Sequence, residues 1–104
     1  MPQADLYFTT DNDFSRAETL AAIEDLVRAF DAGAGVCKGR AHPVAEFHHS
    51  HIFLRLSLLP KPHRDAEYAA ELGRRLAALL RPRAAAEGAV AVNVSFDLLH
   101  YTAA

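Results

Sequence analysis

The first residue with an evident chemical use is the proline in the opening segment MPQADLYF. A Met followed by a small residue is normally removed in the cytosol, and its removal would leave Pro2 with a free secondary amine on a rigid ring. An N-terminal amine has a pKa of about 8, so it can act as a base near neutral pH. Proline is also well tolerated at the start of a strand. Pro2 is therefore either an ordinary first residue of a strand or the base of an enzyme.

Basic residues lie two apart in the segment VCKGRAH, at Lys38, Arg40 and His42. Strand side chains alternate between two faces, so these three residues are expected to point the same way. Such a row favours an anion site, because Arg offers a planar fork to a carboxylate. It is also typical of a charged edge strand that prevents aggregation. Arg64, in PKPHRD, lies either at the mouth of a pocket or in a solvated first helical turn.

A second group of candidate residues is the histidine run FHHSH. His49 and His51 would share a strand face, and this spacing can bind zinc or copper. A third ligand would have to come from His42 or His100. Histidines at the junction of a loop and a strand also make pH-sensitive contacts. A histidine-rich metal-binding protein is thus one alternative function.

The elements that must position these residues follow from hydrophobic spacing. SRAE resembles a capping box, with Ser15 as the N-cap of the first helix and Glu18 three residues later. Side chains of the third strand alternate between apolar and mixed faces. The expected strands are 3–9, 36–42, 51–59 and 89–99, and the expected helices run from 15 to 30 and from about 65 to 80.

The order strand, helix, strand occurs twice, and such a unit makes a right-handed crossover between parallel strands. Two units predict an α+β two-layer fold, in which a four-stranded sheet carries both helices on one face. The other face is mixed, as Phe53, Arg55, Ser57 and Leu59 illustrate. That face either contacts other subunits or is solvated, as in a non-catalytic ferredoxin-like binding or regulatory module.

Composition limits the class of protein. The chain has 104 residues, which fits a single domain over 1–104. Its formal net charge of -2 argues against a nucleic-acid partner. No apolar run approaches the ~18 residues of a membrane span, and no secretory signal is present. Cys37 is the only cysteine, which fits a reducing cytoplasmic location, and it is expected to be a small core residue.

Together these motifs resemble the tautomerase superfamily, the group that includes 4-oxalocrotonate tautomerase and macrophage migration inhibitory factor. The match is closest to 5-carboxymethyl-2-hydroxymuconate isomerase. It rests on MP at the start, LYFTTDN in the first strand and turn, GVCKGRAH in the second strand, PHRDAEYAAELGRRL at the second helix and VSFDLLH in the last strand. Most of the chain is covered, and the motifs follow the family's order and spacing.

The resemblance implies a homotrimer in which three sheets meet by their uncovered faces. It implies a cofactor-independent tautomerase or isomerase, active in the catabolism of aromatic compounds. The substrate would be a small unsaturated 2-hydroxy or 2-oxo dicarboxylate similar to 5-carboxymethyl-2-hydroxymuconate. Pro2 and Arg40 would be catalytic, and Lys38 and Arg64 would bind the substrate. Lys38 stands where the family has an arginine, and a lysine lacks the bidentate grip on a carboxylate.

Overall fold

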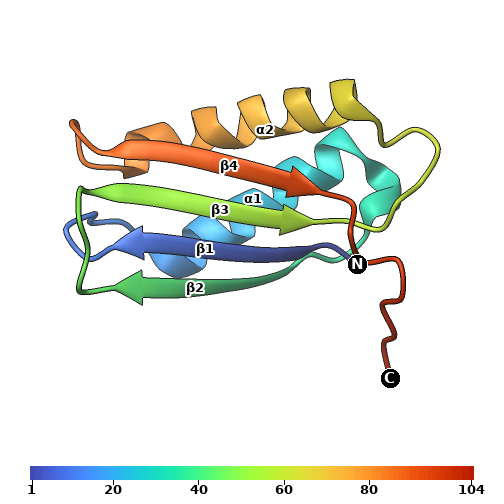
Figure 1. Ribbon diagram of the computed structural model, residues 1–104, viewed down its shortest axis with the longest axis horizontal. Coiled ribbons are helices and arrows are strands. Elements are labelled where there is room, and N and C mark those ends of the chain that lie inside the picture. Colours follow the sequence, from blue (N-terminus) through green and yellow to red (C-terminus); the bar gives the residue numbers. More distant parts are fainter.

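The computed structural model describes all 104 residues, arranged in two layers that consist of one sheet and one pair of helices (Figure 1). Short 3₁₀ turns follow each helix, at Ala32–Ala34 and Arg81–Arg83. Neither helix is long and apolar enough to cross a membrane. The main elements in chain order are β1 (Gln3–Thr9), α1 (Arg16–Phe30), β2 (Lys38–Val44), β3 (His51–Ser57), α2 (Ala66–Leu80) and β4 (Ala89–Ser95).

The sheet has the strand order β2-β1-β3-β4. Strand β1 is parallel to β2, and β3 is parallel to β4, as expected when a helix connects two neighbouring strands. The two halves meet where β1 pairs with β3 in antiparallel orientation. This is the tandem strand–helix–strand fold predicted from the sequence.

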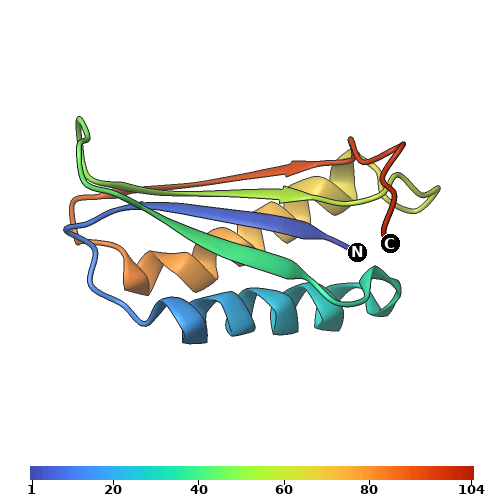
Figure 2. The same cartoon turned by 90° about the horizontal axis from the view of Figure 1, so that it is seen from below.

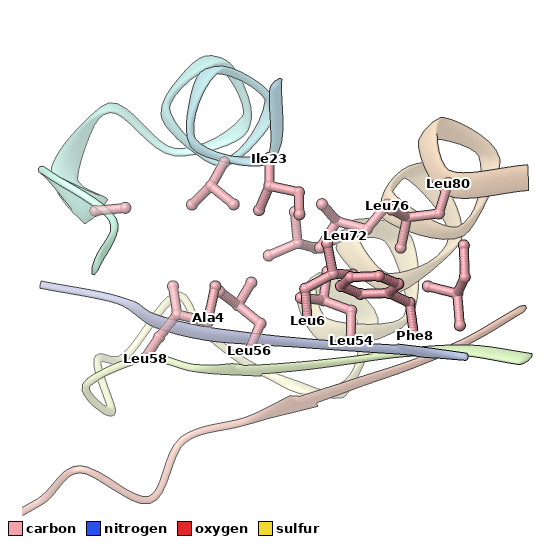
Figure 3. Packing of buried hydrophobic residues seen from close by; sticks show 13 residues of the cluster. Ala4, Leu6, Phe8, Ile23, Leu54, Leu56, Leu58, Leu72, Leu76 and Leu80 are labelled. Carbon is pink, nitrogen blue, oxygen red and sulfur yellow. The ribbon is translucent and has the colours of Figure 1, made fainter. Parts of the chain in front are cut away.

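Both helices cover the same face of the sheet, and the other face is open (Figure 2). Residues on alternate positions of the two central strands point into the layer between sheet and helices, where they meet apolar residues of α1 and α2 (Figure 3). Burial of this apolar surface is the main force that holds the layers together. The fully buried members include Leu6, Ile23, Leu54, Leu56, Leu72, Leu76 and Leu80.

Each helix begins at a side-chain cap. The Ser15 hydroxyl accepts the N–H of Glu18 at 3.3 Å, and the Asp65 carboxylate accepts the N–H of Tyr68 at 2.9 Å. These bonds satisfy backbone donors that have no partner inside the helix. The Glu18 side chain binds Arg83 at 2.8 Å, which connects the start of α1 to the turn after α2.

Three strands differ from the sequence prediction: β2 is shifted by two residues from 36–42, and β3 and β4 end before the predicted 59 and 99. The pairing register explains the bounds of β2 and the end of β4. Strand β2 begins at Lys38 because Lys38 pairs with Gln3, the first residue of β1, and it continues to Val44 opposite Thr9. Strand β4 ends at Ser95 because its partner Ser57 is the last residue of β3. The alternation of apolar residues in the sequence continues past the point at which the neighbouring strand stops, so it overestimates where a strand ends.

Close approach of α1 to β2 explains the glycine between the two cations of β2. A Cβ atom built on Gly39 would lie 3.2 Å from Leu20 Cδ2, tighter than an ordinary contact. Ala41, two residues later, also packs against the core. Lys38, Arg40 and His42 therefore point to the open face, as their spacing predicted.

Candidate active site

The strand directions bring the proposed site residues toward one end of the sheet. Strands β1 and β2 begin at this end, and β3 and β4 finish there (Figure 1). Pro2 precedes β1, Lys38 opens β2, and Arg64 lies in the loop that follows β3. Segments far apart in the sequence therefore meet at this end of the sheet, as an active site requires. We call this end, where β1 and β2 begin, the Pro2 edge.

Pro2 is buried at this edge and is held by the backbone. Its carbonyl oxygen accepts the N–H of Lys38 at 2.9 Å, which extends the β1–β2 pairing by one residue. Met1 before it is 39% exposed. The nitrogen of Pro2 is thus at the boundary between the packed sheet and solvent, on an anchored residue.

Arg40 lies on the open face and is oriented by two residues of β1. Both terminal nitrogens of Arg40 donate to the side-chain oxygen of Gln3, one of them at 3.2 Å, and its Nε lies 3.4 Å from Asp5 Oδ1. His42 Nε2 lies 2.8 Å from the same Asp5 oxygen, and its ring stacks on Tyr7 with centroids 4.5 Å apart. These contacts fix the guanidinium two residues inward from the Pro2 edge.

Lys38 differs from Arg40 because its side chain is exposed and has no carboxylate within ion-pair distance. It pairs with Gln3 in the register of β1 and β2, next to Pro2. An ammonium without a protein counter-ion is free to bind an external anion, although as a point charge rather than a fork. Of the three predicted cations, Lys38 is the one most accessible to a ligand.

Arg64 is buried and bonded to the protein itself. Its Nε and one terminal nitrogen donate to Asp31 Oδ2 at 3.1 and 3.0 Å, and its other terminal nitrogen donates to the Leu59 carbonyl at 2.8 Å. The side chains of Arg64 and Asp31 are only 3% and 9% exposed. A substrate carboxylate would have to replace Asp31 to reach this guanidinium, so substrate binding by Arg64 stays a prediction.

Asp31 is the centre of a polar cluster that joins the end of α1 to the start of α2. The Tyr68 hydroxyl donates to it at 2.7 Å, and His63 Nε2 lies 3.0 Å away. Burial opposes ionisation of this carboxyl, but hydrogen bonds from His63, Tyr68 and Arg64 outweigh burial and hold its pKa well below the usual range. Burial and the bond to Asp31 raise the pKa of Tyr68 to about 12. The cluster therefore holds an ionised carboxylate and a neutral phenol at neutral pH.

Sequence reasoning missed Asp31 and Gln3 as partners of the predicted arginines. Asp31 is the first residue of the DAGAG segment that ends α1, and an acidic residue at that position was a usable signal. Nothing in the sequence marks Gln3 as a partner of an arginine, because a polar residue at the first position of a strand has no typical partner. Both contacts depend on strand register, which the sequence pattern alone does not specify.

The histidine run lies at the opposite end of the sheet, before β3. His48 and His49 pack ring to ring, and His51 Nδ1 lies 2.9 Å from the His49 carbonyl. No group of three or more His, Cys, Asp or Glu side chains is arranged to hold a metal ion. His42 is bound to Asp5, and His100 is in the tail after β4, so the fold does not bring the proposed third ligands to this run.

The one hollow in the surface of the chain is also at that opposite end. It has a volume of about 690 Å³ and is lined by residues before β3 and before β4, among them Asp11, His49 and Glu87. The Pro2 edge forms no enclosed pocket in the single chain.

Comparison with known proteins gives no match to a family model and no match among curated proteins. Among solved structures, a 5-carboxymethyl-2-hydroxymuconate isomerase from Deinococcus radiodurans R1 superposes with a TM-score of 0.67. The match has 25% sequence identity and covers 90% of this chain and 81% of that chain. The chain has the fold of the tautomerase superfamily.

A second similar solved structure is that of a probable enzyme from the thermophilic fungus Aspergillus fumigatus. It superposes with a TM-score of 0.57 at 16% identity and covers 90% of this chain and 73% of that chain. At this identity it supports the fold alone. The first match is also the type of enzyme that the motifs of the sequence resemble, so sequence and structure agree on an enzyme of the tautomerase or isomerase type.

Proposed function

We propose that this protein is a cofactor-independent tautomerase or double-bond isomerase whose base is the amine of Pro2, exposed by removal of Met1. The observation that carries the proposal is the position of Pro2, which is buried and anchored beside the unpaired cation Lys38. The substrate is a small unsaturated 2-hydroxy or 2-oxo carboxylate, and the resemblance specifies a dicarboxylate. The isomerase from Deinococcus radiodurans R1 supports the reaction type.

The reaction requires one proton to leave one atom of a conjugated system and return to another. The neutral amine of Pro2 takes a proton from the hydroxyl of a 2-hydroxy substrate, which leaves the enolate directly. From a 2-oxo substrate it takes a proton from carbon, and the electron pair of that C–H bond moves toward the carbonyl oxygen to form the enolate. The resulting prolinium returns the same proton at a different atom, with rearrangement of the double bonds. No electron is gained or lost, and the amine is regenerated.

The amine suits this step because an N-terminal amine begins with a pKa of about 8. Burial and neighbouring cations both disfavour the charged form of an amine and lower its pKa further. Pro2 is buried, and Lys38 is adjacent across the sheet. Both effects favour the neutral form of the Pro2 amine, which is the form that can accept a proton.

The carboxylates of the substrate are bound by the cations of β2. Lys38 attracts one carboxylate as a free ammonium, and Arg40 stabilises negative charge that develops on the enolate. Arg64 contributes a second carboxylate contact only if the loop before α2 releases Asp31. Binding of a dicarboxylate would thus be coupled to opening of that ion pair.

The assembly we propose is a homotrimer formed through the open face of the sheet. That face carries the stacked rings of Tyr7, His42 and Phe53, and an uncovered aromatic cluster is typical of an interface. A neighbouring copy would supply the surface that the Pro2 edge lacks. Sedimentation velocity of the purified protein is expected to show a species of about three chains.

The test of the proposed base compares two altered proteins with the wild type. Pro2→Ala replaces the ring amine with an ordinary primary amine, and insertion of a lysine between Met1 and Pro2 retains Met1 and converts the amine to an amide. Intact mass establishes the terminus of each protein, and absorbance follows turnover of 2-hydroxymuconate. We expect turnover to fall about 100-fold or more, the range for loss of a general base.

Circular dichroism and sedimentation of both altered proteins serve as the folding control. Turnover by the lysine-inserted protein at the wild-type rate would overturn the role of Pro2. The tautomerase fold would then belong to a protein of different activity.

A further inference from the structure

The chain after β4 returns to the edge of the sheet that carries Pro2. In both views the segment from 96 to 104 passes beside the N-terminus (Figures 1 and 2). A turn in which the Tyr101 N–H donates to the Leu98 carbonyl at 3.0 Å brings the tyrosine back toward β1. Its hydroxyl accepts a hydrogen bond from Gln3 Nε2 at 3.2 Å. Tyr101 therefore contacts the residue that follows Pro2.

The direction of this hydrogen bond is fixed by Arg40. Arg40 can only donate, so the oxygen of the Gln3 amide faces the guanidinium and its NH₂ group faces Tyr101. The phenol oxygen of Tyr101 accepts that NH₂ hydrogen. Its own hydrogen is not used in this bond and is free to donate to a ligand at the edge.

Three hydroxyl groups toward this end, those of Ser57, Ser95 and Tyr68, already have acceptors. Ser57 and Ser95 lie 3.2 Å apart, and Ser95 donates onward to Asp97 at 3.2 Å. Tyr68 donates to Asp31 within the buried cluster. Tyr101 is 37% exposed, and its phenol is held by Gln3 while its own hydrogen has no protein acceptor.

From this geometry we infer that Tyr101 is a catalytic residue that donates a hydrogen bond to the developing enolate oxygen, with Gln3 as the residue that positions it. The inference rests on the proposed function and adds a residue to that site. The proton stays on Tyr101, while the proton transferred in the reaction is carried by Pro2. A neutral donor aimed at an oxygen that gains charge stabilises the transition state more than the ground state.

The kinetic test uses Tyr101→Phe, which removes only the hydroxyl. Thr102→Val removes the next hydroxyl of the same tail and is the matched control, since Thr102 is exposed and makes no side-chain hydrogen bond in the structure. With 2-hydroxymuconate as substrate, we expect Tyr101→Phe to lower kcat about 10- to 100-fold with little change in KM. Gln3→Leu is expected to reproduce part of this loss, and Thr102→Val to leave kcat unchanged.

A binding test separates this inference from the proposed reaction. Oxalate is planar and places a charged oxygen beside a carboxylate, as the enolate of a 2-oxo acid does. Titration calorimetry of wild type and Tyr101→Phe with oxalate needs no turnover. Loss of the hydroxyl is expected to weaken oxalate binding about tenfold, equivalent to one hydrogen bond to a charged group.

An unchanged kcat, or equal affinity for oxalate in both proteins, would overturn the role of Tyr101 and leave Pro2 unaffected. If the Pro2 proteins lose activity and Tyr101→Phe keeps full activity, the role of Tyr101 is likewise wrong and the role of Pro2 stands. If oxalate binding depends on Tyr101 but the lysine-inserted protein turns over substrate normally, the hydroxyl is retained as an anion ligand and the proposed base is wrong.

Discussion

Replacement of Asp31 by Asn tests the buried cluster that occupies Arg64. The amide keeps the size of the carboxylate but removes its charge, so the Arg64 guanidinium, whose side chain is 3% exposed, stays buried without a counter-ion. Removal of one partner from a buried pair costs about 3–5 kcal/mol in the free energy of unfolding. For a domain of this size, that loss lowers Tm by about 12–20 °C.

The assay is thermal unfolding followed by circular dichroism at pH 7, with Glu71→Gln as the control. Glu71 pairs with Arg74 and Arg75 on the exposed side of α2, and exposed pairs contribute little to stability. If Asp31→Asn has a Tm close to that of Glu71→Gln, the buried Arg64 guanidinium does not need Asp31 as its counter-ion, and the reasoning is refuted.

The same variant tests how the contribution of the Asp31 carboxylate to the free energy of unfolding depends on pH. The folded-state pKa of Asp31 lies below its ordinary value of 3.8, so the carboxylate stabilises the fold fully above that value. As pH falls below 3.8 toward the folded pKa, this stabilisation is lost. The difference in unfolding free energy between wild type and Asp31→Asn is therefore expected to be constant from pH 7 to 5 and to shrink only in stronger acid.

Two further predictions concern Lys38 and Cys37. Lys38→Gln is expected to raise KM about tenfold for a carboxylate substrate with a smaller effect on kcat, while Lys38→Arg retains affinity; equal KM in all three proteins would exclude Lys38 as the anion ligand. Burial, and then the charge of Glu24, raise the pKa of the Cys37 thiol to about 11, so a disulfide reagent at pH 8 is expected to react with it much more slowly than in the unfolded chain. Equal reaction rates in the folded and unfolded chains would contradict a buried Cys37 thiol with a raised pKa.

The fold could be predicted from the sequence because its signals are local and repeated. Alternate apolar residues from Ile52 in β3 to Leu58 just after it predicted one buried face, and all four are buried. The cap at Ser15 marked the start of α1, and the structure contains that bond. The end of β4 could not be predicted, because it depends on where β3 stops.

The direction in which the β2 side chains point was predictable from the sequence, but their contacts were not. The spacing of Lys38 and Arg40 placed both on the open face, as the core contacts of their neighbours confirm. The pairing of Arg64 with Asp31 joins residues 33 positions apart and carries no periodic signal. No pattern in the sequence marks Tyr101, because only the path of the tail brings it to Gln3.

The measurement that tests the central claim most directly is kcat/KM for 2-hydroxymuconate in the untagged protein and in the protein with a lysine between Met1 and Pro2. We predict that the wild type, whose mass lacks Met1, is at least about 100-fold more active than the blocked form. Equal activity of the two proteins would contradict a proline base and assign the tautomerase fold to another function.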